Sequence, residues 1–235
     1  MVPDTPLFSF SGPLGVRVEV GRSLIFLVMI LLLLGGGNVG FAVGLITVLL
    51  LSVTLHEYGH AWACRVQGVP VRRIMITGGG GFCERAATVT PRQEEFIVMM
   101  GPLVNLALWA LAGIAQAALI AWITPDPGAA RLPSLDTVRL VLAAHAWLGF
   151  FGLINLALFL FNLVPVQPLD GGKLLQLGLL RVTDPLTAIR IAGMVGVVFA
   201  VLWIPGLVAM WYLLGWVLFF MPSIGLHLQM ARAGR

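Results

Sequence analysis

Two histidines and a glutamate stand at helical spacing in the segment His56-Glu57-Tyr58-Gly59-His60. Side chains four residues apart lie on one face of a helix, so both imidazoles can reach one metal ion, and Glu57 can address a water molecule there. The segment lies toward the end of a long apolar stretch, where ionisable side chains are costly and mark functional sites. The pattern predicts a metal site with His56 and His60 as ligands and Glu57 beside a metal-bound water. The alternative is a polar patch whose members bind their neighbours.

A catalytic zinc ion needs a third protein ligand and an open position for water. His145, at the outer start of a later apolar stretch, is expected to make an interfacial hydrogen bond, and His227, after the last stretch, is expected to be solvated. Cys64 lies eight residues beyond His56, about 12 Å along a helix axis, which is too far to share the ion comfortably. The remaining candidates are carboxylates, namely Glu84, Glu94, Glu95 and Asp170.

Asp170 lies in a stretch that should break a helix, Asn162-Leu163-Val164-Pro165-Val166-Gln167-Pro168-Leu169-Asp170-Gly171-Gly172. Two prolines interrupt the helix, and two glycines free the backbone afterwards. Broken helices at membrane depth are tolerated where they line a cavity or are buried in protein. The preceding apolar stretch ends on the same face of the membrane as His60, which favours Asp170 as the third ligand. The alternative is an ordinary turn with a solvated Asp170.

The composition is that of an integral membrane protein. Of 235 residues, 59% are hydrophobic and only 10% are charged, and the mean hydropathy is +1.00, whereas a soluble domain carries about 25% charged residues. A soluble enzyme, a disordered tail and a nucleic-acid binder are therefore poor fits, and no basic run is dense enough to follow phosphates. The two cysteines, Cys64 and Cys83, provide no disulfide framework and are expected to be free thiols on the reducing side.

The fold class expected is an all-α polytopic membrane protein, a single core over residues 1–235 with no internal repeat and no second domain. Spanning the bilayer takes roughly 20 apolar helical residues. With a cytosolic N-terminus, only Arg131 and Arg139 of the 14 Lys and Arg residues fall outside, so the positive-inside rule places both termini in the cytosol. About six spans are predicted, at 23–36, 41–64, 96–122, 141–164, 187–203 and 205–221.

Three segments between the spans have the pattern of strands, namely 15–20, 71–77 and 82–89. They predict a small membrane-associated β-sheet on the cytosolic side. An exposed edge, suggested at Val71–Thr77, could bind an extended substrate segment by strand addition. The loop 123–140, in which two prolines flank Asp126, is expected to be a plain extracytosolic connection.

The motifs resemble those of the site-2 protease family of intramembrane zinc metalloproteases (peptidase family M50). The similarity rests on the His56–His60 segment, on the stretch from Asn162 to Gly172, and on Gly101-Pro102-Leu103-Val104-Asn105. It implies one Zn²⁺ held by His56, His60 and Asp170, with Glu57 as the base and Asn162 as a donor to the developing oxyanion. Asn162 could instead cap carbonyl groups freed near Pro165. Asn105 and Asn155 are expected to form interhelical hydrogen bonds.

The resemblance also implies a reaction and its setting. The reaction is hydrolysis of a peptide bond within or near the transmembrane helix of a single-span membrane protein, as in regulated intramembrane proteolysis that releases a transcriptional regulator. No PDZ-like or nucleotide-binding regulatory domain is expected, so the substrate, the activating signal and the oligomeric state stay open. Arginine outnumbers lysine 13 to 1, which favours a G+C-rich prokaryotic genome and hence a prokaryotic cell membrane.

Two alternatives remain open at this point. A membrane metalloprotease could use a glutamate such as Glu84 as its third ligand, although the glycine run at 78–81 breaks the helix that would present it. A non-catalytic zinc-binding protein or a metal transporter is the other class. Transporters commonly show repeat symmetry with broken helices in corresponding halves, and only the fourth predicted span is broken here.

Overall fold

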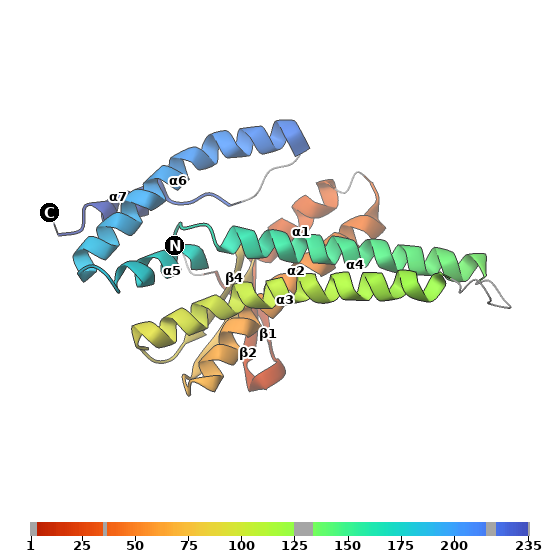
Figure 1. Cartoon of the computed structure of the whole chain (residues 1–235), viewed down its shortest axis with the longest axis horizontal. Helices are drawn as coiled ribbons and strands as arrows, with labels where there is room; N and C mark the ends of the chain where they lie inside the picture. Colours follow the sequence, from red (N-terminus) through yellow and green to blue (C-terminus); the bar gives the residue numbers. More distant parts are fainter. Residues whose placement is uncertain (1–3, 35–36, 125–133, 215–219, 235) are drawn as a thin grey trace.

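The computed structural model describes residues 4–34, 37–124, 134–214 and 220–234, and it is mostly helical with one small sheet (Figure 1). Among the described residues, four helices are long and apolar enough to cross a membrane, so the chain is an integral membrane protein. Part of the predicted loop 123–140 falls outside the described residues. The four helices are α2 (Val39–Val66), α3 (Pro91–Ile123), α4 (Leu135–Asn162) and α6 (Pro185–Leu214).

Polar side chains define where three of these helices begin. The Asn38 side chain accepts a hydrogen bond from the Phe41 amide at the start of α2. Thr90 and Gln93 form a reciprocal capping box at the start of α3. Ser134 accepts from the Thr137 amide at the start of α4. Each cap satisfies an amide group that has no partner inside its helix.

The prediction of six spans is not confirmed, for two reasons. The predicted span 23–36 corresponds to α1 (Ser23–Leu34), which has only 12 residues. The predicted break between spans 187–203 and 205–221 is not present, because α6 continues through Pro205 to Leu214 as one helix, and residues 215–219 of the second predicted span lie outside the described residues. In an apolar environment nearly every backbone group must be bonded within its own segment. Pro205 has no amide hydrogen, so α6 loses one backbone hydrogen bond at this position. A turn here would leave several backbone groups without partners, which costs more.

The sheet has the strand order β1-β2-β3-β4 and confirms the predicted small sheet. The central strands β2 and β3 are parallel, and the two outer pairs are antiparallel. Val18, Ile74 and Ile76 from the sheet pack against Ala61 of α2, which fixes the sheet beside the C-terminal half of that helix. The strands are β1 (Pro6–Ser11), β2 (Arg17–Gly21), β3 (Val71–Thr77) and β4 (Gly80–Arg85).

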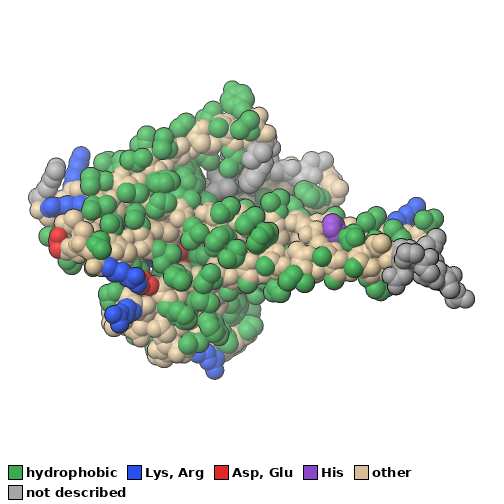
Figure 2. Space-filling model, viewed as in Figure 1, with side chains coloured by type: hydrophobic (Ala, Val, Ile, Leu, Met, Phe, Trp, Pro, Cys, Tyr) green, Lys and Arg blue, Asp and Glu red, His purple; other side chains and the backbone are tan. Residues whose placement is uncertain are grey.

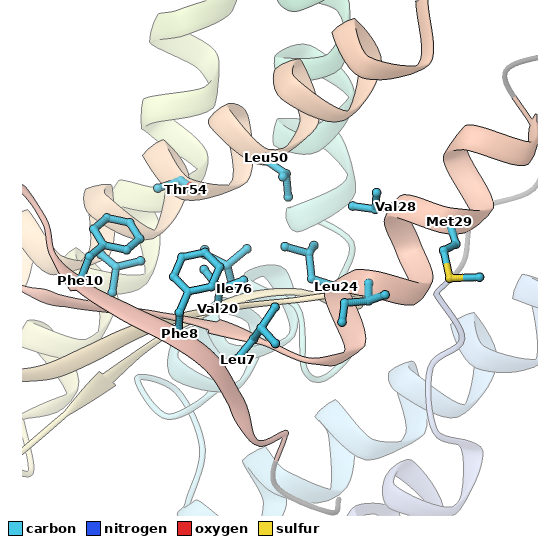
Figure 3. Close-up of a pocket in the computed structure, with 12 residues that line it drawn as sticks. Leu7, Phe8, Phe10, Val20, Leu24, Val28, Met29, Leu50, Thr54 and Ile76 are labelled. Atoms are coloured by element: carbon cyan, nitrogen blue, oxygen red, sulfur yellow. The ribbon is translucent and has the colours of Figure 1, made fainter. Parts of the chain in front are cut away.

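An apolar cavity of about 360 Å³ opens between the sheet, α1 and α2 (Figure 3). Phe8 and Phe10 of β1 face it from one side, and Leu50 and Thr54 of α2 face it from the other. Thr54 is the one polar residue in its lining. The strand β1 was not predicted from the sequence, and its apolar side chains form part of this wall.

The C-terminal segment turns back along α6 (Figure 1). The short helix α7 (Ile224–Ala231) packs against α6, and the Arg190 side chain donates to the Ala233 carbonyl at 2.6 Å. A second short helix, α5 (Asp170–Leu179), contacts both α3 and α6. The segment between α4 and α5 therefore lies where α3, α6 and α7 can support it.

Candidate metal centre

The structure brings His56, His60 and Asp170 together at one buried point. The Nε2 atoms of His56 and His60 are 3.1 Å apart, and Asp170 Oδ2 lies 3.1 Å from His56 Nε2 and 3.3 Å from His60 Nε2. All three residues are less than 9% exposed. No other group of three His, Cys, Asp or Glu side chains comes this close within the ranges that the structure describes.

The spacing of these three atoms fits a single metal ion. Ligand atoms about 2.0–2.1 Å from a tetrahedral ion such as zinc lie about 3.3 Å from one another, and the three distances here are 3.1, 3.1 and 3.3 Å. Two imidazoles and one carboxylate are a common ligand set for catalytic zinc. The donors and their geometry therefore suit a metal ion with one position left open.

The other ring nitrogen of each histidine is also engaged. His56 Nδ1 lies 2.6 Å from Asn105 Oδ1, and His60 Nδ1 lies 2.8 Å from the Ile97 carbonyl oxygen. Both oxygens are acceptors, so we assign the ring proton of each histidine to Nδ1. Each Nε2 lone pair is then directed at the shared point, which is the usual arrangement for histidine ligands.

Asn105 belongs to a buried network that joins three helices. Its amide donates to Asn155 Oδ1 of α4 at 2.8 Å, and Asn155 donates to Ser52 Oγ of α2 at 2.9 Å. Asn105, Asn155 and Ser52 are completely buried. The predicted interhelical hydrogen bonds of Asn105 and Asn155 are confirmed. The contact between Asn105 and His56 was not predicted, and it makes Asn105 a partner of the site.

Two glycines let α2 and α3 approach closely enough for these contacts. A methyl group at Gly59 would lie 2.6 Å from the Met100 carbonyl oxygen. A methyl group at Gly101 would lie 2.6 Å from His56 Nε2 and would also collide with the His60 ring. Gly101 and Asn105 are four residues apart and so face the same side of α3. One residue makes room for the imidazoles and the other orients His56, which accounts for their spacing.

Asp170 is presented at the first turn of α5, after a non-helical segment that follows α4. A methyl group at Gly171 would lie 2.5 Å from the Val164 carbonyl oxygen, and one at Gly172 would lie 2.7 Å from the Gln167 nitrogen. The two glycines therefore allow α5 to begin directly against the segment that precedes it. This close return brings the Asp170 carboxylate to the histidines.

Glu57 is also buried, at 4% exposure, and lies against β4. A methyl group at Gly81 would lie 2.6 Å from Glu57 Cγ, so only a glycine at this point of β4 leaves room for the glutamate side chain. Asn162, by contrast, donates its side-chain amide to the Leu158 carbonyl within α4 at 3.0 Å. That hydrogen bond lies within α4, and it matches neither of the two roles predicted for Asn162.

The other predicted carboxylate candidates are held in ion pairs. Glu84 binds Arg73 at 2.6 Å and Arg72 at 2.9 Å, and these guanidinium groups hold the pKa of Glu84 below its ordinary value. Glu94 pairs with Arg85, and Glu95 pairs with Arg181. The structure therefore gives no support to Glu84 as a third ligand.

Two further histidines and the cysteines complete the predicted residues. The His145 ring and carbonyl both lie near the Gln116 side chain, and the carbonyl accepts its hydrogen bond at 3.0 Å. The prediction that His227 is solvated is wrong. This residue of α7 is completely buried, and its ring contacts the segment before α5. Cys64 and Cys83 are free thiols. Cys64 packs with Ala63 and other apolar residues and is not part of the group of His56, His60 and Asp170.

The sequence matches one family model and several named relatives. The model of peptidase family M50 matches residues 44–122 and 135–204. A putative zinc metalloprotease of Synechocystis sp. is 36% identical over 143 residues, which cover 60% of this chain and 33% of the relative. A zinc metalloprotease of Methanocaldococcus jannaschii is 29% identical over 185 residues, which cover 78% of this chain and 48% of the relative. The chain spans less than half of the length of these relatives.

The fold also matches a solved structure, a site-2 protease from Methanocaldococcus jannaschii. The TM-score is 0.62 at 24% sequence identity, and the match covers 95% of this chain and 91% of that chain. The residues matched by the family model include His56, His60 and Asp170, together with Asn105 and Asn155 that support them. The chain belongs to peptidase family M50.

Proposed function

We propose that this protein is a zinc-dependent intramembrane endopeptidase that cleaves membrane-anchored proteins within or near a transmembrane helix. The observation that carries the proposal is the meeting of His56, His60 and Asp170 at metal-ligand distances in the interior of a membrane protein. The names of the relatives as zinc metalloproteases support both the metal and the reaction class.

The chemistry is divided between the metal and the side chains around it. Zinc supplies a Lewis acid for the scissile carbonyl group and makes water nucleophilic near neutral pH. Glu57, next to His56 in the sequence, accepts the proton of the attacking water and passes it to the leaving amine nitrogen. Asn162 serves as a donor to the oxyanion once its side chain releases the Leu158 carbonyl group.

The substrate must present an extended backbone, because the carbonyl groups of an intact helix are already bonded. The suggestion that Val71–Thr77 is an exposed edge is wrong, since β3 pairs with β2 on one side and β4 on the other. The edge strand beside Glu57 is β4. We therefore assign strand addition to the free edge of β4, which would place an unwound substrate segment next to the catalytic base.

The orientation of the protein follows from its charges. Figure 2 shows most of the visible Lys and Arg side chains at the end of the molecule that holds α5 and the C-terminus, with hydrophobic side chains over much of the rest. The positive-inside rule makes this end cytosolic. We therefore place both termini in the cytosol. We further propose that the host is a prokaryotic cell membrane and that residues 1–235 form one protease core. A membrane-anchored regulator released into the cytosol is the expected kind of substrate.

The test combines metal analysis with cleavage of a single-span reporter in proteoliposomes. Wild type should hold about one zinc per chain and cleave the reporter. Glu57→Gln should keep the zinc and abolish cleavage, and Glu84→Ala should change neither. Loss of zinc in Glu84→Ala would make Glu84, and not Asp170, the third ligand. Zinc binding without cleavage of any reporter would indicate a non-catalytic protein. A wild-type protein that takes up no zinc would refute the proposal that this protein is a zinc-dependent enzyme.

A further inference from the structure

A fourth histidine, His227 of α7, is buried beside the segment that carries Asp170. Its side chain is completely buried, and both ring nitrogens have partners. Nδ1 lies 2.7 Å from the Ser223 carbonyl oxygen and therefore carries the ring proton. Nε2 is then an acceptor, and it receives a hydrogen bond from the backbone amide of Gln167 at 3.0 Å.

The Gln167 amide donates its hydrogen bond outside its own segment, unlike the neighbouring amides. Pro165 and Pro168 on either side of it have no amide hydrogen to donate. Val166, Leu169 and Gly172 donate to carbonyl groups within the segment itself, at 2.8, 2.9 and 3.1 Å. The Gln167 amide instead points out of the segment to His227. This hydrogen bond thus joins α7 to the short segment that ends at Asp170.

The position of His227 is itself tightly defined by α6. A methyl group at Gly196 would lie 2.5 Å from His227 Nε2, and one at Gly193 would lie 2.8 Å from the Met230 backbone. The indole of Trp203 donates to the Phe220 carbonyl at 2.8 Å. The Phe220 ring meets the ring of Phe161, near the end of α4, with centroids 5.2 Å apart. The C-terminal segment is therefore fixed to both helices that flank the Asp170 segment.

We propose that His227 is a positioning residue for Asp170, acting through the Gln167 amide to hold the third metal ligand in place. The inference rests on the proposed zinc site and goes beyond it, since residue 227 lies outside the residues that the family model matches. The C-terminal helix α7 becomes part of the support of the metal centre. An apolar side chain at 227 could fill the space but could not accept the hydrogen bond.

The test compares two substitutions of similar size. In His227→Gln the side-chain oxygen can take the place of Nε2 as an acceptor, whereas His227→Leu removes the acceptor. The readouts are zinc affinity, by competition with a chelator in detergent, and thermal unfolding of the zinc-free protein. Lost support of a metal ligand typically weakens affinity about 10–100-fold. We expect a loss of about tenfold or more for His227→Leu, and an affinity within about threefold of wild type for His227→Gln.

A glycine pair on α6 provides a second, independent comparison. Gly196→Ala should displace the His227 ring and weaken zinc binding, whereas a methyl group at Gly206 meets nothing within 4 Å, so Gly206→Ala is the matched control. A folded His227→Leu or Gly196→Ala protein with wild-type zinc affinity would overturn the inference. So would equal loss in His227→Gln and His227→Leu. A wild type that binds no zinc would instead refute the proposed function, and this inference with it.

Discussion

The two histidines and Asp170 reach the same point by different routes. His56 and His60 come from one continuous helix, one turn apart, and α3 supports both rings directly through Asn105 and the Ile97 carbonyl. Asp170 follows His56 by 114 residues and begins α5, directly after a segment without regular structure. Its support comes from glycines at the start of α5 and from the C-terminal helix.

The difference separates what a helix provides from what tertiary packing provides. Helical periodicity alone places two imidazoles on one face, and close packing of α2 on α3 sets the ring orientations. A carboxylate on a broken segment has no such local rule, so its position depends on several distant contacts. The two halves of the centre should therefore respond differently to substitution, and zinc affinity is the measurement common to both.

The largest effect is expected when a ligand is removed. Asp170→Ala should abolish zinc binding at micromolar metal, because losing a ligand costs more than the roughly 10–100-fold typical of outer partners. Zinc per chain after dialysis would measure it, with Glu84→Ala as the matched carboxylate control. Retention of stoichiometric zinc by Asp170→Ala would remove Asp170 from the centre.

The next largest effect is expected from a substitution in α3 that displaces the two histidine rings. Gly101→Ala places a methyl group 2.6 Å from His56 Nε2, so the rings or the helices must shift. We expect a loss of about 1–3 kcal/mol in unfolding free energy, together with weak zinc binding. Gly113→Ala on the same helix meets nothing within 4 Å and serves as the control. Equal behaviour of the two variants would mean that the close approach at Gly101 does not matter.

A smaller effect is expected from the network behind His56. Asn105→Ala leaves His56 Nδ1 and the Asn155 side chain without their partner. Zinc affinity should fall about 10–100-fold, and stability should fall by about 1–3 kcal/mol for the unpaired buried groups. Chelator competition and thermal unfolding would measure these two losses. Unchanged affinity in Asn105→Ala would show that His56 needs no orienting partner.

The smallest effect on zinc is expected at Asn162, whose side chain bonds only to the Leu158 carbonyl among its described partners. Asn162→Ala should leave zinc affinity within about twofold of wild type, because Asn162 does not support a ligand. If Asn162 donates to the oxyanion, kcat should still fall about 10²–10³-fold. Unchanged kcat would restrict Asn162 to its local role in α4.

The sequence indicated the centre better than its surroundings. His56, Glu57 and His60 follow from helical spacing, and Asp170 from a proline and glycine pattern, so their proximity could be anticipated. The burial of His227 could not, because it depends on α7 folding back onto α6. The strand β1 was missed because its neighbours, and not its own pattern, pair it into the sheet. Similarly, only the observed strand order shows that β3 is internal.

The shortness of α1 has a consequence for the membrane around the protein. Its 12 residues rise about 18 Å, whereas the hydrocarbon core is about 30 Å thick. A helix of this length that crossed the whole bilayer would need local thinning of the bilayer beside it. Lipids with longer acyl chains raise the cost of that thinning, and shorter chains lower it. The thickness of the host bilayer would then affect how stably this protein is held in the membrane, separately from any residue of its candidate metal centre.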